Sequence, residues 1–209
     1  MQSLSIKGKI NQFFAVIVKK FRTLFLDPVG VYYKCKKIMR IIFIKLIGGI
    51  PPIYGEDYDM HWNFTSFKDK IILDLGADYG STAYYFLRKK AKKIIAVEGD
   101  PQLASKLRLH FQNDKDKVIP IEDFIDSPKK IEKLISEYNP NLVKVDIEGS
   151  EKYLLEVDNV EQVDEWLIEA HSEEIYQALY RFLVEHNFYV RSFRYLGNVK
   201  IIYASKMSK

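Results

Sequence analysis

The sequence has a single cysteine, Cys35, among 209 residues. One cysteine cannot form a disulfide within the chain, and it cannot supply the thiolate cluster of a cysteine-based zinc site. These absences exclude a disulfide-stapled secreted domain. We therefore expect a protein of the reducing cytoplasm, with the inner membrane surface as a second location for its basic N-terminal segment.

Long hydrophobic runs are also absent. The apolar run Phe13–Val18 stops at Lys19, and Ile41–Ile44 stops at Lys45, so neither approaches the ~20 residues that cross a bilayer. Both runs are too short for a signal peptide, and we expect neither a membrane span nor a cleaved leader. The chain is 47% hydrophobic, which is sufficient for one globular domain with a short appendage and excludes wholesale disorder.

Positive charge is concentrated in one segment. The net charge is +4, but residues 1–50 hold ten basic residues against one acid, Asp27, and so carry +9. The remainder carries −5 by difference, which gives no electrostatic footprint for a nucleic-acid-binding body. Nucleic acid is therefore not an expected partner of the main domain.

The basic segment has the pattern of a helical hairpin. Apolar positions between residues 10 and 25 recur at helical spacing, and Asp27 followed by Pro28 is typical of a second helix start. We consider three roles for residues 1–50: a lid or homodimer contact, a peripheral membrane contact, and an RNA contact. An aromatic-rich connector at 51–69 follows, whose rings either fill the core or form a stacking platform for a sugar. The binding domain is predicted at 70–209.

Beyond residue 69, short apolar runs alternate with helical stretches. This alternation predicts an α/β fold with a parallel sheet covered on both faces, because parallel neighbours need crossover connections. A C-terminal β-hairpin is predicted at 188–194 and 199–204. The ligand site is expected at the carboxyl ends of the strands. The other predicted strands are 71–73, 94–97, 118–121, 142–145 and 166–168, and the predicted helices are 81–90, 101–112, 128–137, 150–157 and 173–186.

A glycine-rich turn follows the first predicted strand, at residues 74–80. Such a turn brings the backbone close to a ligand and presents helix N-terminal amides to it. Its D-x-G-x-x-x-G spacing differs from the G-x-G-x-x-G that seats a pyrophosphate, and its leading carboxylate attracts an ammonium or sulfonium group. We therefore favour S-adenosylmethionine over NAD as the cofactor. The candidate cofactor-binding residues of this turn are Asp74, Gly76, Ala77, Asp78, Tyr79 and Gly80.

Acidic residues also end the second and third predicted strands. Glu98 follows Asp74 by 24 residues, at the position where an acid accepts both ribose hydroxyls of an adenosine. The neighbouring Gly99 is a further candidate. Glu122 or Asp123, after the third strand, is placed to accept the adenine amino hydrogen. The alternative is that these acids and glycines serve only turn geometry.

The chemistry is expected after the fourth and fifth strands. Asp146 and Glu148 project to one face of the chain because side chains alternate with a period of two, and His171 follows the fifth strand. These three are the candidate catalytic residues, with His171 the preferred base for a hydroxyl proton and Asp146 the second. Asp146 is also a candidate cofactor contact. In a less favoured alternative, Asp146, Glu148 and His171 hold a divalent cation; the leading prediction includes no metal.

These motifs resemble those of FkbM-type methyltransferases. The shared features are D-x-G-A-x-x-G at residues 74–80, the acid Glu98, and K-x-D-x-E-G-x-E at residues 144–151, within a match over roughly 54–175. The loop after Glu98 is two residues longer than the family's E-P. The resemblance implies a Rossmann-like class I methyltransferase fold and S-adenosylmethionine-dependent O-methylation of a small molecule, glycan or glycolipid.

Two other functions remain open from the sequence. An RNA or nucleobase methyltransferase would share the fold and the cofactor, but the N/D-P-P-Y/F motif that holds an exocyclic amine is replaced here by Asp146-Ile147-Glu148-Gly149. A non-catalytic nucleotide-fold module, attached to a membrane or a partner through residues 1–50, is the second. No residue identifies the methyl acceptor.

Overall fold

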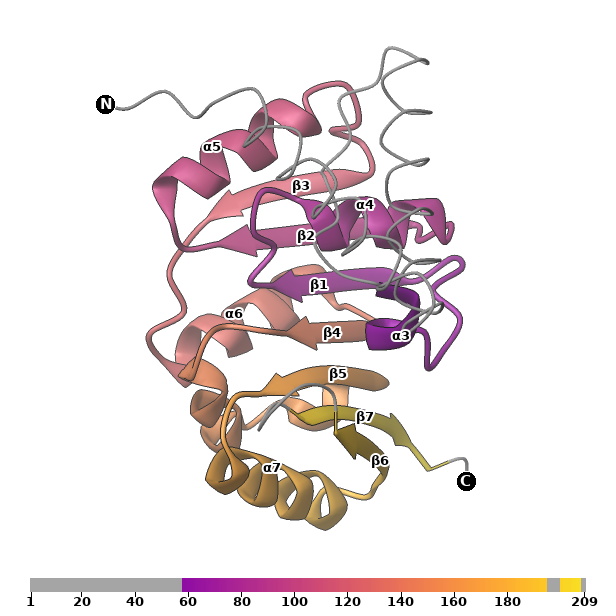
Figure 1. Cartoon of the computed structure of the whole chain (residues 1–209), viewed down its shortest axis with the longest axis vertical. Helices are drawn as coiled ribbons and strands as arrows, with labels where there is room; N and C mark the ends of the chain where they lie inside the picture. Colours follow the sequence, from indigo (N-terminus) through magenta and orange to yellow (C-terminus); the bar gives the residue numbers. More distant parts are fainter. Residues whose placement is uncertain (1–57, 195–199, 208–209) are drawn as a thin grey trace, which may run out of the picture. The chain divides into compact units, whose positions relative to one another are not determined.

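The computed structural model describes residues 58–194 and 200–207 (Figure 1). The helical hairpin predicted at 1–50 and the first part of the aromatic connector, 51–57, lie outside the described residues. In the part of the chain that is described, no helix is long and apolar enough to cross a membrane.

The core of the fold is one seven-stranded sheet with the order β3-β2-β1-β4-β5-β7-β6 (Figure 1). The neighbours among β1 to β5 pair in parallel. Strand β7 lies between β5 and β6 and is antiparallel to both, which confirms the predicted parallel sheet with a C-terminal hairpin. The strands are β1 (Ile71–Leu75), β2 (Lys93–Glu98), β3 (Val118–Glu122), β4 (Leu142–Val145), β5 (Glu165–Ala170), β6 (Phe188–Arg194) and β7 (Lys200–Lys206).

Helices cover both faces of the sheet, as the alternating pattern predicted. One buried cluster includes Ile131 and Leu179 from two of the helices, and a second, on the other side of the sheet, includes Phe86 and Leu107 from two more. The helix predicted at 150–157 is a 3-10 helix. The helical elements are α3 (Tyr58–Trp62), α4 (Ser81–Arg88), α5 (Pro101–His110), α6 (Pro128–Tyr138), η1 (Ser150–Glu156), η2 (Val160–Gln162) and α7 (Glu173–Glu185).

The described part of the aromatic connector contributes to the core. Trp62 and Phe67 are 1% and 2% exposed and pack with the buried residues of α4. Apolar burial of this extent stabilises each ring by a few kcal/mol, about 1.5–3 for a side chain of this class. For these two rings, core packing rather than a sugar-stacking platform is the role that the structure shows.

The position of the site follows from the strand order. Strand β1 lies between β2 and β4: the chain runs from β1 to β2 and β3 on one side of it and then returns to β4 and β5 on the other side. In open α/β sheets the crevice at such a reversal, at the carboxyl ends of the strands, is where ligands bind. The turn after β1, Glu98, Asp146 and His171 all lie at this edge.

Candidate active site

The turn after β1 passes directly against the end of β4. Gly76 has φ +76°, and a Cβ on it would lie 1.7 Å from the carbonyl oxygen of Asp146. The amides of Gly76 and Ala77 both donate to the carbonyl of Val97, at 3.0 and 2.9 Å. Glycine is therefore required at position 76 by contact as well as by conformation.

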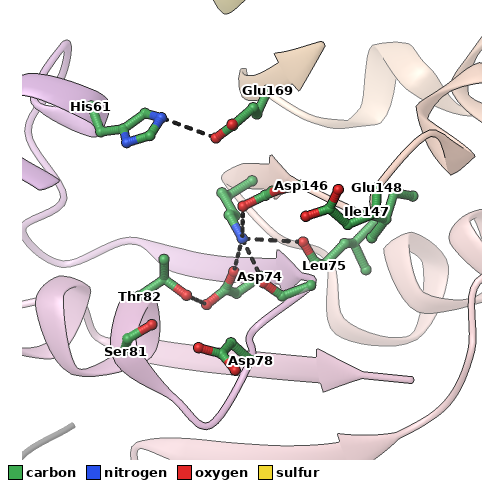
Figure 2. Close-up of polar contacts among 12 residues, drawn as sticks. His61, Asp74, Leu75, Asp78, Ser81, Thr82, Asp146, Ile147, Glu148 and Glu169 are labelled. Atoms are coloured by element: carbon green, nitrogen blue, oxygen red, sulfur yellow. Dashed lines mark hydrogen bonds and ion pairs between the residues drawn. The ribbon is translucent and has the colours of Figure 1, made fainter. Parts of the chain in front are cut away.

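A buried ion pair lies beneath this turn (Figure 2). Asp74 and Lys144 are both 0% exposed, and Lys144 Nζ lies 3.2 Å from Asp74 Oδ1. The hydroxyl of Thr82 donates to Asp74 Oδ2 at 2.6 Å. Lys144 Nζ also donates to the carbonyl of Gly76 at 2.6 Å and lies 3.6 Å from Asp146 Oδ2. One ammonium group thus fastens the β1 turn to β4.

The charges of the pair depend on each other. Burial raises the pKa of the Asp74 carboxyl, against the opposing effects of Lys144 and the Thr82 hydroxyl. Burial alone would lower the pKa of Lys144, but Asp74 and Asp146 outweigh it and raise that pKa above its ordinary 10.5. Because Asp74 is buried and its charge is met by Lys144, we revise its role: it organises the turn and does not face a ligand.

Glu98 is bound to the turn through both of its carboxylate oxygens. Oε2 accepts from the amide of Asp78 and Oε1 from the amide of Asp100, each at 2.8 Å. Glu98 is partly exposed, and each oxygen keeps a further lone pair for a hydroxyl. The longer loop has a local purpose, because Asp100 caps α5 by accepting from the amides of Gln102 and Leu103.

Asp78 and two further glycines complete the loops at this edge of the sheet. Asp78 has φ +52°, and burial raises its pKa while the amide of Tyr79 opposes that rise. Gly80, at φ +100°, is the N-cap of α4 and packs against Phe111. A Cβ on Gly99 would lie 2.7 Å from the ring of Phe124, so the glycines at 76, 80 and 99 all mark close approaches.

The two acids at the end of β3, Glu122 and Asp123, are already paired with cations. Arg108 lies 2.8 Å from Glu122, and Lys130 lies 2.8 Å from Asp123. The neighbouring Phe124 is 63% exposed and lies against Gly99. No sequence motif pointed to this ring, although a large apolar residue directly after the strand-end acids was a signal that could have revealed it.

His171 brings together the acids of β4 and β5. Its Nδ1 lies 2.8 Å from Glu151 Oε1, and its Nε2 lies 3.7 Å from Asp146 and 3.5 Å from Glu148. The predicted residues Asp146, Glu148 and His171 therefore meet. Glu169, whose Oε1 lies 3.8 Å from His171 Nε2, was not predicted as a member.

Glu151 holds the imidazole in place. It is 0% exposed, and its Oε1 accepts from the amides of Gly149 at 3.1 Å and Ile147 at 3.3 Å. Burial alone would raise the pKa of Glu151, but the hydrogen bond from His171 outweighs it and lowers that pKa. The turn between β4 and η1 can curl around this carboxylate because Glu148 and Gly149 adopt positive φ values of 49° and 92°. The last acid of the K-x-D-x-E-G-x-E motif is thus an anchor for the imidazole.

The protonation of His171 follows from these neighbours. The hydrogen bond to Glu151, with further attraction to Asp146 and Glu148, raises the pKa of His171 to about 9. An imidazole with this pKa carries its proton at pH 7 and does not accept another, which disfavours His171 as the preferred base. Burial raises the pKa of Asp146, against the opposing effect of Lys144.

A second histidine reaches the same cluster from α3. His61 is 0% exposed, and its Nε2 lies 2.9 Å from Glu169 Oε2 (Figure 2). The ring stacks on Trp62 with centroids 4.7 Å apart. No local pattern connects residues 61 and 169, so only the fold could reveal this contact.

Comparison with known sequences found one curated relative at a significant level of similarity. No family model matches the chain. Uncharacterized protein 158B of Sulfolobus islandicus rod-shaped virus 1 is 36% identical over 102 residues, which are 48% of this chain and 61% of that protein. The chain thus spans less than two thirds of this curated relative's length.

Several solved structures share the architecture. A SAM-dependent O-methyltransferase from Thermotoga maritima has a TM-score of 0.53 at 13% identity, covering 79% of this chain and 70% of that one. Precorrin-6y C5,15-methyltransferase from Geobacter metallireducens has a TM-score of 0.52 at 19% identity, covering 67% of this chain and 81% of that one. Ribosomal protein L11 methylase from Lactobacillus delbrueckii has a TM-score of 0.52 at 12% identity, covering 71% of this chain and 76% of that one. The chain has the Rossmann-like fold of class I methyltransferases.

Proposed function

We propose that this protein is an S-adenosylmethionine-dependent O-methyltransferase of the FkbM type, acting on a hydroxyl of a small molecule, glycan or glycolipid. The observation that carries the proposal is the charge around the β1 turn. Asp78, Glu98 and Asp146 present partly exposed carboxylates there, whereas Lys144 is fully buried. Such a site repels a pyrophosphate and attracts a ligand with ammonium and sulfonium groups.

The ribose and the adenine of the donor each have a group that suits them. Glu98 retains lone pairs for the two ribose hydroxyls, and the exposed ring of Phe124 offers a flat apolar surface for an adenine. When bound, the donor would supply an electrophilic methyl carbon on a cationic sulfur. The cluster at the ends of β4 and β5 then lies where an acceptor would dock.

The acceptor must lose a proton as its oxygen takes the methyl group. Asp146 is the residue that we assign to this proton, because its carboxylate is partly exposed while His171 already carries a proton. The burial that raises the pKa of Asp146 makes it a better base than an ordinary carboxylate. The imidazolium of His171, 3.7 Å away, keeps the neighbouring acids from repelling one another. Alignment of donor and acceptor supplies most of the remaining acceleration.

Cofactor choice is tested by thermal unfolding of the full chain with S-adenosylmethionine or NAD. A donor at 100 times its Kd stabilises the folded protein by about 2.7 kcal/mol. This stabilisation raises the Tm of a domain of this size by roughly 5–10 °C. Glu98→Gln should weaken donor binding at least roughly tenfold by calorimetry, because it weakens hydrogen bonds to a charged acceptor. Glu161→Gln, which changes an exposed residue of η2, should leave the donor affinity unchanged. A shift with NAD alone would refute the proposal.

The acceptor class is tested with a labelled methyl donor offered to fractionated lipid, glycan, RNA and protein extracts. Label in a glycan, lipid or small-molecule fraction supports O-methylation. Label confined to RNA would contradict it and favour the nucleic-acid alternative. Donor binding without label in any fraction would contradict catalysis and favour the non-catalytic module.

A further inference from the structure

Three side chains converge between the ends of β4 and β5. Asp146, Glu169 and His171 each offer one ligand atom, and these atoms all lie within 4.8 Å of one another. Ligands at 2.0–2.6 Å from one cation are separated from one another by at most about 5 Å. The three atoms are therefore already close enough to share a single ion.

Asp146 is held at one oxygen and open at the other. Its Oδ2 lies 3.6 Å from Nζ of Lys144, which is fully buried. Its Oδ1 instead faces His171 Nε2 at 3.7 Å. The lysine thus fixes the carboxylate from beneath and leaves the second oxygen toward the centre of the cluster.

Glu169 and His171 follow the same arrangement. Glu169 Oε2 lies 2.9 Å from the buried His61, while Oε1 faces the cluster. His171 Nδ1 pairs with the buried Glu151 at 2.8 Å, while Nε2 faces Asp146 and Glu169 at 3.7 and 3.8 Å. Metal-ligating histidines commonly donate their other ring N–H to a carboxylate in this way.

The inner partners distinguish this cluster from a chance group of surface acids. Lys144, His61 and Glu151 are each 0% exposed, and each holds one of the three residues by the atom that turns away from the centre. The facing atoms are 3.7 and 3.8 Å apart, beyond hydrogen-bond length. The exposed Glu148 adds a further negative charge, 3.5 Å from the same imidazole nitrogen.

We propose that Asp146, Glu169 and His171 bind one divalent cation with a preference for mixed oxygen and nitrogen ligands, for which Mn²⁺ is the probe. Two carboxylates and one imidazole leave further coordination positions to water or a ligand oxygen. The assigned role rests on the proposed function: the cation replaces the proton on His171 Nε2, holds the acceptor hydroxyl, and favours loss of the hydroxyl proton to water or to the Asp146 oxygen that does not bind the ion. Binding of the ion itself does not depend on methyl transfer.

The test is titration of the full-length, EDTA-treated protein with MnCl₂ alone, followed by electron paramagnetic resonance of free Mn²⁺. We expect one ion per chain. Glu169→Gln and Asp146→Asn should each weaken binding roughly tenfold or more. The matched control is Glu173→Gln, which removes an exposed carboxylate that pairs with Lys200 at 2.8 Å outside the cluster and should leave the affinity unchanged.

Absence of Mn²⁺ binding in the wild-type protein overturns the proposal without reference to any variant. Equal affinities in Glu169→Gln and Glu173→Gln, both shown to be folded by their unfolding transitions, would also overturn it. The donor-binding measurement is made separately in EDTA. A shift with S-adenosylmethionine but no Mn²⁺ binding removes the ion site alone, whereas Mn²⁺ binding without donor binding removes the proposed function alone.

Discussion

Replacement of Lys144 by methionine tests the ion pair beneath the β1 turn. The change keeps most of the aliphatic volume of the side chain and removes the ammonium group, whose nearest carboxylate is Asp74 at 3.2 Å. Asp74 is 0% exposed and cannot regain its lost interaction from water. The variant should therefore lose stability through an uncompensated buried charge rather than through a cavity.

Three estimates bound the size of the loss. At 3.2 Å and an effective dielectric constant of about 20, the attraction is about 5 kcal/mol. Deleting one partner of a buried pair costs about 3–5 kcal/mol. Asp74 can escape by taking up a proton, which at pH 7 costs a group with the ordinary pKa of 3.8 about 4 kcal/mol. We expect a loss of about 3–4 kcal/mol.

Urea denaturation followed by tryptophan fluorescence measures this loss, because Trp62 and Trp166 are both buried. The double variant Asp74→Asn/Lys144→Met removes both charges and should lie within about 1–2 kcal/mol of the wild type. In Lys144→Met the folded-state pKa of Asp74 rises further above its unfolded value, so stability is lost as pH rises. The difference from the wild type should shrink by about 1.4 kcal/mol per unit as pH falls from 7 toward 4.

Additive losses would refute this reasoning. If the double variant lost as much as the two single variants together, Asp74 and Lys144 would not interact across 3.2 Å in the way described. A loss below about 1 kcal/mol in Lys144→Met that is independent of pH would refute it as well.

Two further predictions concern the backbone of the turn and the imidazole. Gly76→Ala should lower the free energy of unfolding in urea by more than about 2 kcal/mol, because its Cβ would lie 1.7 Å from the carbonyl oxygen of Asp146. The control Gly149→Ala, also at positive φ but with nothing within 4 Å of its Cβ, should lower it less. In metal-free protein, the pH midpoint of the His171 titration followed by NMR should lie near 9. The protonated imidazole then stabilises the folded protein fully below its ordinary pKa of about 6.5, and this stabilisation is lost as pH rises through 9. Glu151→Gln should lower that midpoint, and a wild-type midpoint near 6.5 would contradict the assignment.

Local patterns were sufficient for the strands and for the edge that carries the site. Short apolar runs separated by helix-length segments favour a parallel sheet with crossovers, and the observed pairing among β1 to β5 agrees. The same patterns placed Glu98, Asp146 and His171 at neighbouring strand ends, since parallel strands end at one edge. They did not specify that β7 inserts between β5 and β6.

Contacts between distant segments were beyond these patterns. His61 lies in a five-residue helix and meets Glu169 at 2.9 Å, and no periodicity connects the two positions. The pKa of His171 was likewise out of reach, because it depends on the distance to Glu151 Oε1 and on the burial of that carboxylate. A histidine considered alone has an ordinary pKa of about 6.5, and in the metal-free protein these neighbours keep His171 protonated, which disfavours it as a base.

The inward orientation of Asp74 follows from the alternation of side chains along β1 and from the register of β1 with β4. Side chains of a strand alternate between faces, so Asp74 shares the face of Ile72, and the register places it opposite Lys144 on β4. That face is covered by the cluster containing Trp62, whose ring lies 5.8 Å from the Lys144 ammonium. An acid two residues after a fully buried isoleucine must therefore point into the protein, where only a cation of the adjacent strand can balance it. Under the proposed function, the acids that meet the donor lie where strands end: Asp78 and Asp146 come after the last paired residues of β1 and β4, and Glu98 is the last residue of β2.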